Sequence, residues 1–191
     1  MVEASRLSRA FNLVHELVGP SVVSVHTSDR VVYRSWTGRA VREVEAGEGS
    51  GFVVASDAVA SWILTNAHVV LRTGEDQRFV RGKDGAWAGY DRLRVVLHDN
   101  READAVYVGV DVQTDLALVR LPVGNLPAVE WADSDLVKVG DWVLALGYPL
   151  GVGYSATAGI VSATDRSTGI YEAVGGFESF IQTDTAINPG N

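Results

Sequence analysis

The sequence predicts an all-β fold, either a sandwich or barrels, preceded by one short helix. Apolar or alternating runs of strand length follow one another after Pro20 and are rich in valine. Turn-forming residues separate these runs, and no segment after Pro20 keeps a helical period over three turns. Many short strands without intervening helices are typical of sandwiches and barrels. The predicted strands are residues 21–26, 51–55, 62–65, 93–97, 105–110, 116–121, 142–147, 156–163 and 177–182.

The helix is predicted at the N-terminus. Leu7, Phe11, Val14 and Val18 recur at helical spacing on one face, and Gly19 with Pro20 ends the pattern. Charged residues interrupt the apolar ones throughout this segment, so it contains no secretory signal peptide. A cytosolic protein, a chain trimmed of its leader and a start inside a longer gene all remain open.

Size and composition indicate a globular protein. The chain has 191 residues, which corresponds to one compact domain or to two small domains that share an interface. Apolar residues make up 47% and charged residues 21%, so intrinsic disorder is not expected. No uncharged apolar run is long enough to span a membrane.

Charge and cysteine content limit which partners and which catalytic groups the chain can use. The chain has 16 Lys and Arg against 24 Asp and Glu, a net charge of -8, which disfavours nucleic acid as a partner. It contains no cysteine, which removes disulfides, thiolate zinc sites and a cysteine nucleophile but leaves the redox compartment open.

Two segments are predicted to be long surface loops, residues 29–48, which are charged, and residues 72–90, which are rich in glycine. A boundary is predicted near residues 122–135, where two prolines, a glycine and three acidic residues separate two sets of strands. We therefore expect three parts: an N-terminal helical segment at 1–20, and strand-rich units at 21–125 and 126–191.

One histidine and one aspartate stand at strand ends. His68 directly follows a predicted strand, and Asp115 directly precedes another. Taken alone, each favours a structural role, as do His15, His26 and His98. Taken together, they fit acyl transfer, because a carboxylate that accepts the Nδ1 proton orients a base histidine and stabilises its imidazolium form.

The last residues add a turn that suits an oxyanion site. A glycine at position 190 lets the backbone turn its N–H groups inward toward a developing negative charge. As an isolated sequence, residues 188–191 would indicate only a turn.

No cofactor or metal is expected. The glycine-rich segment 147–153 lacks the Lys-Ser/Thr pair of a phosphate-binding loop and leads into a strand. The acidic residues Asp99, Glu102 and Asp104 do not have the spacing of a calcium loop. Ser50 lies between two glycines but does not match a nucleophile elbow.

Short motifs stand in one order along residues 17–191: TNAHVV at 65–70, DLAL at 115–118, GYPLG at 147–151, TAGIVS at 157–162, IQTD at 181–184 and NPGN at 188–191. In this order they resemble the HtrA/Deg group of trypsin-like serine proteases. The resemblance implies two perpendicular six-stranded antiparallel barrels with the active site between them. It also implies that His68 is the general base, that Asp115 orients it, and that Gly190 and Asn191 shape the oxyanion hole.

The same resemblance places the nucleophilic serine immediately after the residue matching Asn191. The 191 residues are therefore expected to be a fragment that lacks the nucleophile, with a truncated second barrel and without peptidase activity of its own. Whether a peptide-binding PDZ domain follows is not determined.

The resemblance implies a serine endopeptidase that acts on unfolded or damaged proteins, in the periplasm or cell envelope, and that assembles as a trimer through its N-terminal segment. The alternative is an inactive homologue that binds extended peptides by strand addition without cleaving them. The residue after Asn191 distinguishes the two. A purely structural barrel protein is a weaker third interpretation, because it leaves the pairing of His68 with Asp115 to chance.

Overall fold

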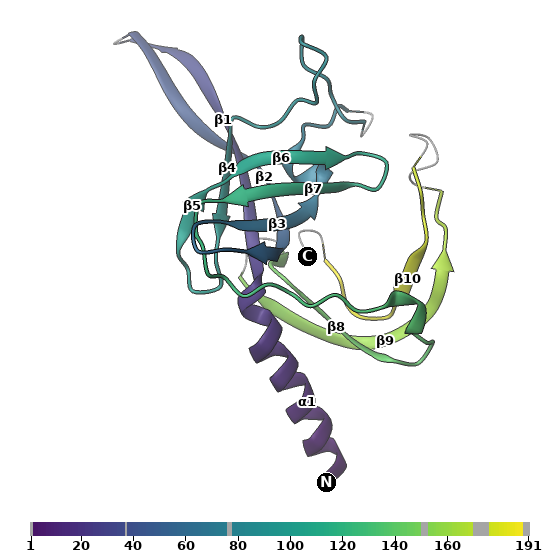
Figure 1. Cartoon of the computed structure of the whole chain (residues 1–191). Helices are drawn as coiled ribbons and strands as arrows, with labels where there is room; N and C mark the ends of the chain where they lie inside the picture. Colours follow the sequence, from purple (N-terminus) through teal and green to yellow (C-terminus); the bar gives the residue numbers. More distant parts are fainter. Residues whose placement is uncertain (1, 37, 76–77, 150–152, 170–175, 189–191) are drawn as a thin grey trace.

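The computed structural model describes residues 2–36, 38–75, 78–149, 153–169 and 176–188. Helix α1 (Val2–Val18) and a short 3-10 helix (Gly19–Ser21) lead into two antiparallel sheets (Figure 1). The predicted N-terminal helix is confirmed, and it ends where Gly19 and Pro20 were expected to end it. No helix in the described ranges is long and apolar enough to cross a membrane.

The first sheet has seven strands in the order β5-β4-β1-β2-β3-β7-β6. Its two end strands, β5 and β6, are separated along the chain by Ala105 alone, so the sheet curls until its ends meet. Counted as one bent strand, β5 and β6 give the six strands expected of a trypsin-like barrel. The strands are β1 (Val22–Ser35), β2 (Gly38–Ser56), β3 (Ser61–Asn66), β4 (Arg92–Val96), β5 (Glu102–Asp104), β6 (Val106–Asp111) and β7 (Leu116–Leu121).

Alternating residues of these strands fill the barrel. In β3 every second side chain is buried, and Ile63 is fully inaccessible to solvent. Val119 of β7, paired with Ile63, is equally buried. Burial of each such side chain contributes roughly 1.5–3 kcal/mol. The core of the molecule is therefore the interior of this first barrel.

The prediction of a loop over residues 29–48 is wrong. Strands β1 and β2 continue through this segment as a two-stranded ribbon, paired from Val22 with Phe52 out to Ser35 with Gly38. The ribbon projects from the barrel (Figure 1). Its charged residues do not prevent pairing, because both faces of a projecting ribbon are solvated and cross-strand hydrogen bonds hold it.

The other predicted loop, residues 72–90, is irregular in its described part. Isolated bridges join Leu71 to Gly89, Thr73 to Phe79 and Arg81 to Trp87. It follows the short helix α2 (Ala67–Val70), which caps the barrel directly after β3.

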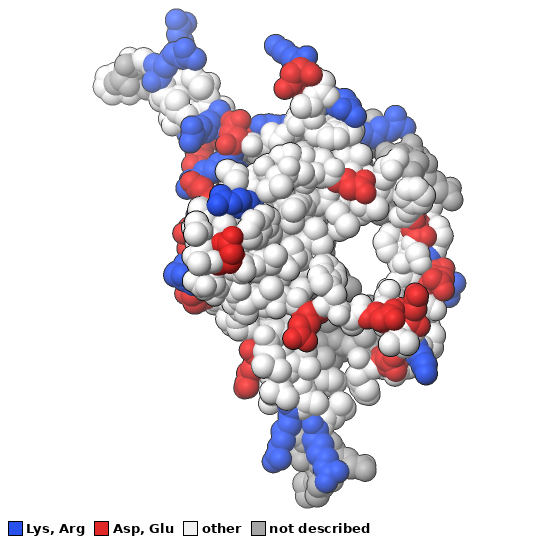
Figure 2. All heavy atoms as spheres, viewed as in Figure 1, with Lys and Arg blue, Asp and Glu red and all other residues white. Residues whose placement is uncertain are grey.

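The second sheet has three strands, β8 (Trp142–Gly147), β9 (Ser155–Arg166) and β10 (Phe180–Thr183), in the order β10-β9-β8. A 3-10 turn (Ser134–Leu136) precedes it. The sheet curves as an open arc beside the first barrel, and the space-filling view shows the molecule open between the two (Figures 1 and 2). The expected all-β, trypsin-like fold is confirmed, and the described part of the second sheet forms an open half-barrel.

Candidate active site

The pairing of β3 with β7 brings two distant positions together. These strands are antiparallel neighbours in which Asn66 pairs with Leu116, so the end of β3 and the start of β7 lie at the same edge. His68 follows β3 on α2, and Asp115 immediately precedes β7. The two residues therefore meet although 47 positions separate them.

Two hydrogen bonds join His68 to Asp115. The ring Nδ1 lies 2.7 Å from Asp115 Oδ2, and the backbone N–H of His68 donates to Oδ1 over 2.9 Å. An ionised carboxylate only accepts, so Nδ1 is the protonated nitrogen in this contact. The imidazole is 58% exposed, whereas the Asp115 side chain is 4% exposed. The contact expected from the sequence is present, with a buried acid beneath an accessible ring.

Asn66 is a third member of this cluster that the sequence analysis missed. Its Nδ2 donates to the Asp115 carbonyl oxygen over 3.1 Å and to the carboxylate Oδ2 over 3.2 Å. The backbone N–H of Ala67 also donates to that carbonyl, over 3.0 Å. The signal available in the sequence was an amide at the last position of the strand, two residues before His68.

These donors hold Asp115 in an unusual backbone conformation. Its φ is +55°, in the left-handed region that residues other than glycine rarely adopt. Such a conformation persists where surrounding contacts over-determine it. At Asp115 the donors on the carbonyl and on both carboxylate oxygens supply these contacts.

The carboxylate also changes the acid–base behaviour of the ring. The hydrogen bond that the ring donates to Asp115 raises the pKa of His68 above its ordinary value, while partial burial of the ring acts in the opposite direction. Because the pKa of the ring is raised, His68 is a stronger base than an isolated histidine.

A second serine, histidine and acid lie together elsewhere on the barrel. Ser24 Oγ is 3.0 Å from Nε2 of His26 and donates to Glu48 over 3.2 Å. This arrangement does not suit nucleophilic catalysis. Ser24 is only 2% exposed, and Glu48 approaches the same ring nitrogen of His26 as the serine does, whereas a catalytic acid must contact the other nitrogen.

The remaining histidines join a separate aromatic cluster. Nδ1 of His15 is 3.2 Å from the Tyr154 hydroxyl, and the His98 ring packs edge-on against the Tyr154 ring with centroids 4.9 Å apart. The cluster links α1, the first barrel and the segment before β9.

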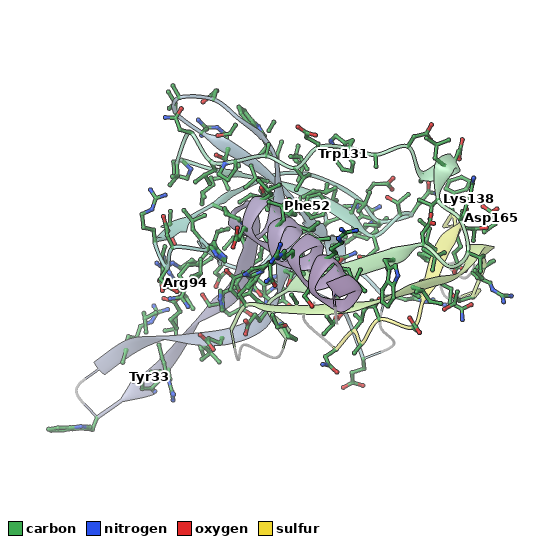
Figure 3. The ribbon with its side chains drawn as sticks, turned by 90° about the horizontal axis from the view of Figure 1, so that it is seen from below. Tyr33, Phe52, Arg94, Trp131, Lys138 and Asp165 are labelled. Atoms are coloured by element: carbon green, nitrogen blue, oxygen red, sulfur yellow. The ribbon has the colours of Figure 1, made fainter. Side chains whose placement is uncertain are left out.

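An apolar cavity of about 540 Å³ adjoins the cluster around Asp115. Both units line it, with Asn66 and Leu116 contributed by the barrel and Leu144 by β8. Trp131 also lines it and packs edge-on against Phe52, with ring centroids 6.0 Å apart; both are labelled in Figure 3.

Comparison with known proteins shows to which family a chain with this site belongs. A model of the trypsin-like peptidase domain matches residues 49–191. The chain belongs to the trypsin-like peptidase domain family. A probable periplasmic serine endoprotease, DegP-like, from Marinomonas sp. (strain MWYL1) is 46% identical over 143 residues, which cover 75% of this chain and 25% of that protein. The corresponding DegP-like protein of Chlamydia pneumoniae is 40% identical over 147 residues, covering 77% of this chain and 25% of the relative.

Comparison with solved structures supports the same family assignment. The HtrA-type protease AlgW with a tripeptide has a TM-score of 0.71 and 34% identity, over 95% of this chain and 48% of that one. AlgW with a decapeptide has a TM-score of 0.70 and 32% identity, over 93% of this chain and 52% of that one. The resemblance to the HtrA/Deg group is therefore confirmed. The peptidase domain described here spans about a quarter of the length of the curated relatives it matches.

Close packing accounts for two glycines, Gly49 in β2 and Gly159 in the motif at 157–162. A Cβ on Gly49 would lie 2.5 Å from a methyl group of Val69, so the approach of β2 to α2 requires glycine. A Cβ on Gly159 would lie 2.4 Å from Oδ1 of Asp184. That oxygen accepts from the N–H of Ile160 over 2.7 Å, which fixes the turn after β10 against β9.

Ser50 has a structural contact in this peptidase domain. Its hydroxyl oxygen accepts from the N–H of Tyr148 over 2.8 Å and so links β2 to the end of β8. Gly190 and Asn191, expected to shape the oxyanion hole, lie outside the described residues.

Proposed function

We propose that this peptidase domain supplies the base and its orienting carboxylate in an HtrA-type serine endopeptidase. The observation that carries the proposal is the 2.7 Å contact between an accessible imidazole and a buried carboxylate. A base must be accessible to its nucleophile, and its orienting acid must be shielded from water to remain effective. His68 and Asp115 meet both requirements.

In this mechanism Nε2 of His68 accepts the proton of a serine hydroxyl as the oxygen attacks the scissile carbonyl carbon. His68 then donates that proton to the leaving amine, and the peptide C–N bond breaks. Asp115 holds the Nδ1–H tautomer and stabilises the imidazolium ion between these steps. Water later hydrolyses the acyl-enzyme by the same proton route.

Asn66 is a positioning residue in this proposal. It donates to both the carbonyl and the carboxylate of Asp115 and so holds the acid in its left-handed conformation beneath the ring. The backbone N–H groups near Gly190 and Asn191 would stabilise the oxyanion. The nucleophile would be a serine directly after Asn191.

We further propose unfolded or damaged polypeptides as substrates, a trimeric assembly through the N-terminal segment, and domain limits at 1–20, 21–125 and 126–191. The relatives are named as probable periplasmic serine endoproteases, which supports polypeptides as the substrate. The two separate sheets support the division after residue 125.

The test compares the 191-residue chain with a form extended by the family's Ser-Gly-Gly segment and remaining strands, using fluorogenic casein. The extended form should cleave casein, and His68→Ala should lower its kcat by about 10⁴-fold or more. His26→Ala is the matched control and should retain activity, although it removes a histidine beside a serine and an acid.

Two results would overturn the proposal. Turnover by the 191-residue chain that a serine-directed phosphonate abolishes would place the nucleophile within these residues. Tight binding of extended peptides by an extended form that never cleaves them would favour the binding-module alternative.

A further inference from the structure

The outer end of the β1–β2 ribbon differs in charge from the rest of the molecule. We define the ribbon tip as residues 31–36 and 38–42, which contain three arginines and no acidic residue in a chain of net charge -8. The ribbon reaches away from the barrel in two perpendicular views, with Tyr33 labelled on it (Figures 1 and 3). Basic side chains are visible on its projecting end, and acidic ones appear nearer the barrel (Figure 2).

Apolar side chains are exposed on both faces of the ribbon tip. Directly paired residues of an antiparallel ribbon share a face, so Val32 and Val41 lie on one face. Val31 and Tyr33, which alternate with Val32, lie on the opposite face. These four residues are 47–63% exposed, and Trp36 at the turn is 98% exposed. A protein partner docked against one face would leave the other bare, whereas insertion of the end into an apolar layer covers both.

The arginines of the ribbon tip lack compensation. Arg34 pairs directly with Arg39, and like charges opposite one another destabilise a strand pair. Across the described ranges neither of them, nor Arg42, forms an ion pair with an acidic side chain. At the base of the ribbon the situation is reversed, since Arg92 lies 3.0 Å from Glu43 and 2.8 Å from Asp104. An anion bound between Arg34 and Arg39 would relieve their repulsion.

We propose that the ribbon tip binds the surface of a bilayer that contains anionic phospholipids. Trp36 and Tyr33 are the residue types that settle at the membrane–water interface. The valines would enter the outer acyl region while the long arginine side chains reach back to lipid phosphates. The acidic remainder of the chain would be repelled by the same surface, so the molecule would attach by the ribbon tip alone.

Vesicle flotation of the 191-residue chain tests this proposal without any need for proteolysis, so its outcome is independent of the proposed function. Phosphatidylglycerol–phosphatidylcholine vesicles should carry the chain to the top of the gradient at low salt, and pure phosphatidylcholine vesicles should not. Arg34→Gln with Arg39→Gln should weaken partitioning roughly 30-fold, since each basic residue near an anionic surface contributes about fivefold. Raising the salt to about 1 M should release the protein, because the screening length falls to about 3 Å.

A matched variant distinguishes binding by the ribbon tip from non-specific electrostatic attraction between the chain and the vesicles. Arg6→Gln with Arg9→Gln removes the same charge from α1, at the other end of the molecule, and should leave partitioning unchanged (Figure 1). Brominated lipids should quench tryptophan fluorescence in the native chain, and Trp36→Phe should abolish that quenching while the other four tryptophans remain.

Three results would overturn the proposal. They are equal flotation with neutral and anionic vesicles, equal losses in the two double variants, and unchanged quenching after Trp36→Phe. A dimer in vesicle-free sedimentation velocity that Trp36→Ser abolishes would also overturn it, because the ribbon tip would then bind a second copy of the chain.

Discussion

The first barrel and the second sheet are both antiparallel and both contain apolar side chains, yet they bury these side chains to different extents. Nearly all fully buried apolar residues belong to the segment from Val22 to Leu121. In the described part of the second sheet, Val161 alone joins them. Trp142 of β8 is 57% exposed, and Phe180 of β10 is 39% exposed. Closure of the first sheet contributes to this difference, because a closed sheet removes from water apolar surface that an open sheet leaves exposed.

The candidate site depends on the closed unit. His68, Asp115 and Asn66 are all held by the pairing of β3 with β7, inside the first barrel. The geometry of the pair therefore does not require the second sheet. What the second sheet adds is one wall of the cavity beside Asn66, through Leu144 and Leu146.

The substitution with the largest expected effect on activity removes the orienting carboxylate of the candidate site and leaves the first barrel folded. Asp115→Asn in the extended form should lower kcat by about 10⁴-fold, because an amide at this position favours the wrong tautomer of His68. Asp104→Asn, which removes an exposed carboxylate paired with Arg92 on the same barrel, is the matched control and should change activity little. Equal losses of casein cleavage in both variants would contradict a specific role for Asp115.

A matched pair of core substitutions measures the difference between the two units directly. Val119 and Val161 are both 0% exposed, one in the barrel and one in the second sheet. Val119→Ala should destabilise the barrel by roughly 2–3 kcal/mol, because its close-packed surroundings cannot collapse into the cavity. Val161→Ala should cost about 1 kcal/mol or less, because an open sheet relaxes around the lost methyl groups.

Chemical denaturation followed by circular dichroism gives both values. Equal losses of stability would mean that the second sheet is packed as tightly as the barrel.

Hydrogen exchange should report the same contrast at single amides. Backbone N–H groups of β3 and β7 lie in the interior of a closed sheet, whereas β8 and β10 are edge strands of an open one. Amides after Pro127 should therefore exchange faster than those of the first barrel, and the purified chain should tend to self-associate through the open edges. Uniform protection in a monodisperse monomer would contradict this expectation.

The smallest expected effects concern the acid–base behaviour of His68. Its pKa is raised in the folded state by the hydrogen bond to Asp115, so this contact stabilises the fold fully below the unfolded pKa of histidine, near 6.5. The contribution is lost as the pH rises through the higher folded-state pKa. Comparing the Tm of the native chain with that of His68→Gln from pH 5 to pH 9 should show this small advantage at the acid end only.

A substitution of Asn66 gives a second test of how Asp115 sets the pKa of His68. Removing its amide in Asn66→Ala leaves Oδ2 of Asp115 with one donor fewer, which strengthens the bond to the imidazole and should raise the pKa of His68 further. An NMR titration of the His68 ring measures the shift, and Asn12→Ala on the exposed face of α1 is the control. An unchanged titration midpoint in Asn66→Ala would reduce Asn66 to a packing role.

Local patterns in the sequence were enough to predict the fold class and the catalytic candidates. A period of two, together with turn residues, is a property of neighbouring positions, so strands such as Leu116–Leu121 can be predicted without knowing their partners. His68 and Asp115 stand at the ends of such runs, and the order of motifs that resembles the HtrA/Deg group implied their roles.

Contacts between distant segments decided the rest. Residues 29–48 look like a loop when judged by their charge, but hydrogen bonds between β1 and β2 make them a ribbon. The role of Asn66 depends on a distant contact, because its partner is Asp115, 49 positions away. The left-handed backbone of Asp115 is likewise held by donors from Asn66 and Ala67. The sequence alone thus determined which segments form strands and which residue types could catalyse, whereas only the tertiary structure decided which strands pair and what holds the acid in place. The physical reason is that side-chain periodicity is local, while strand pairing and hydrogen-bond satisfaction join residues far apart in the chain.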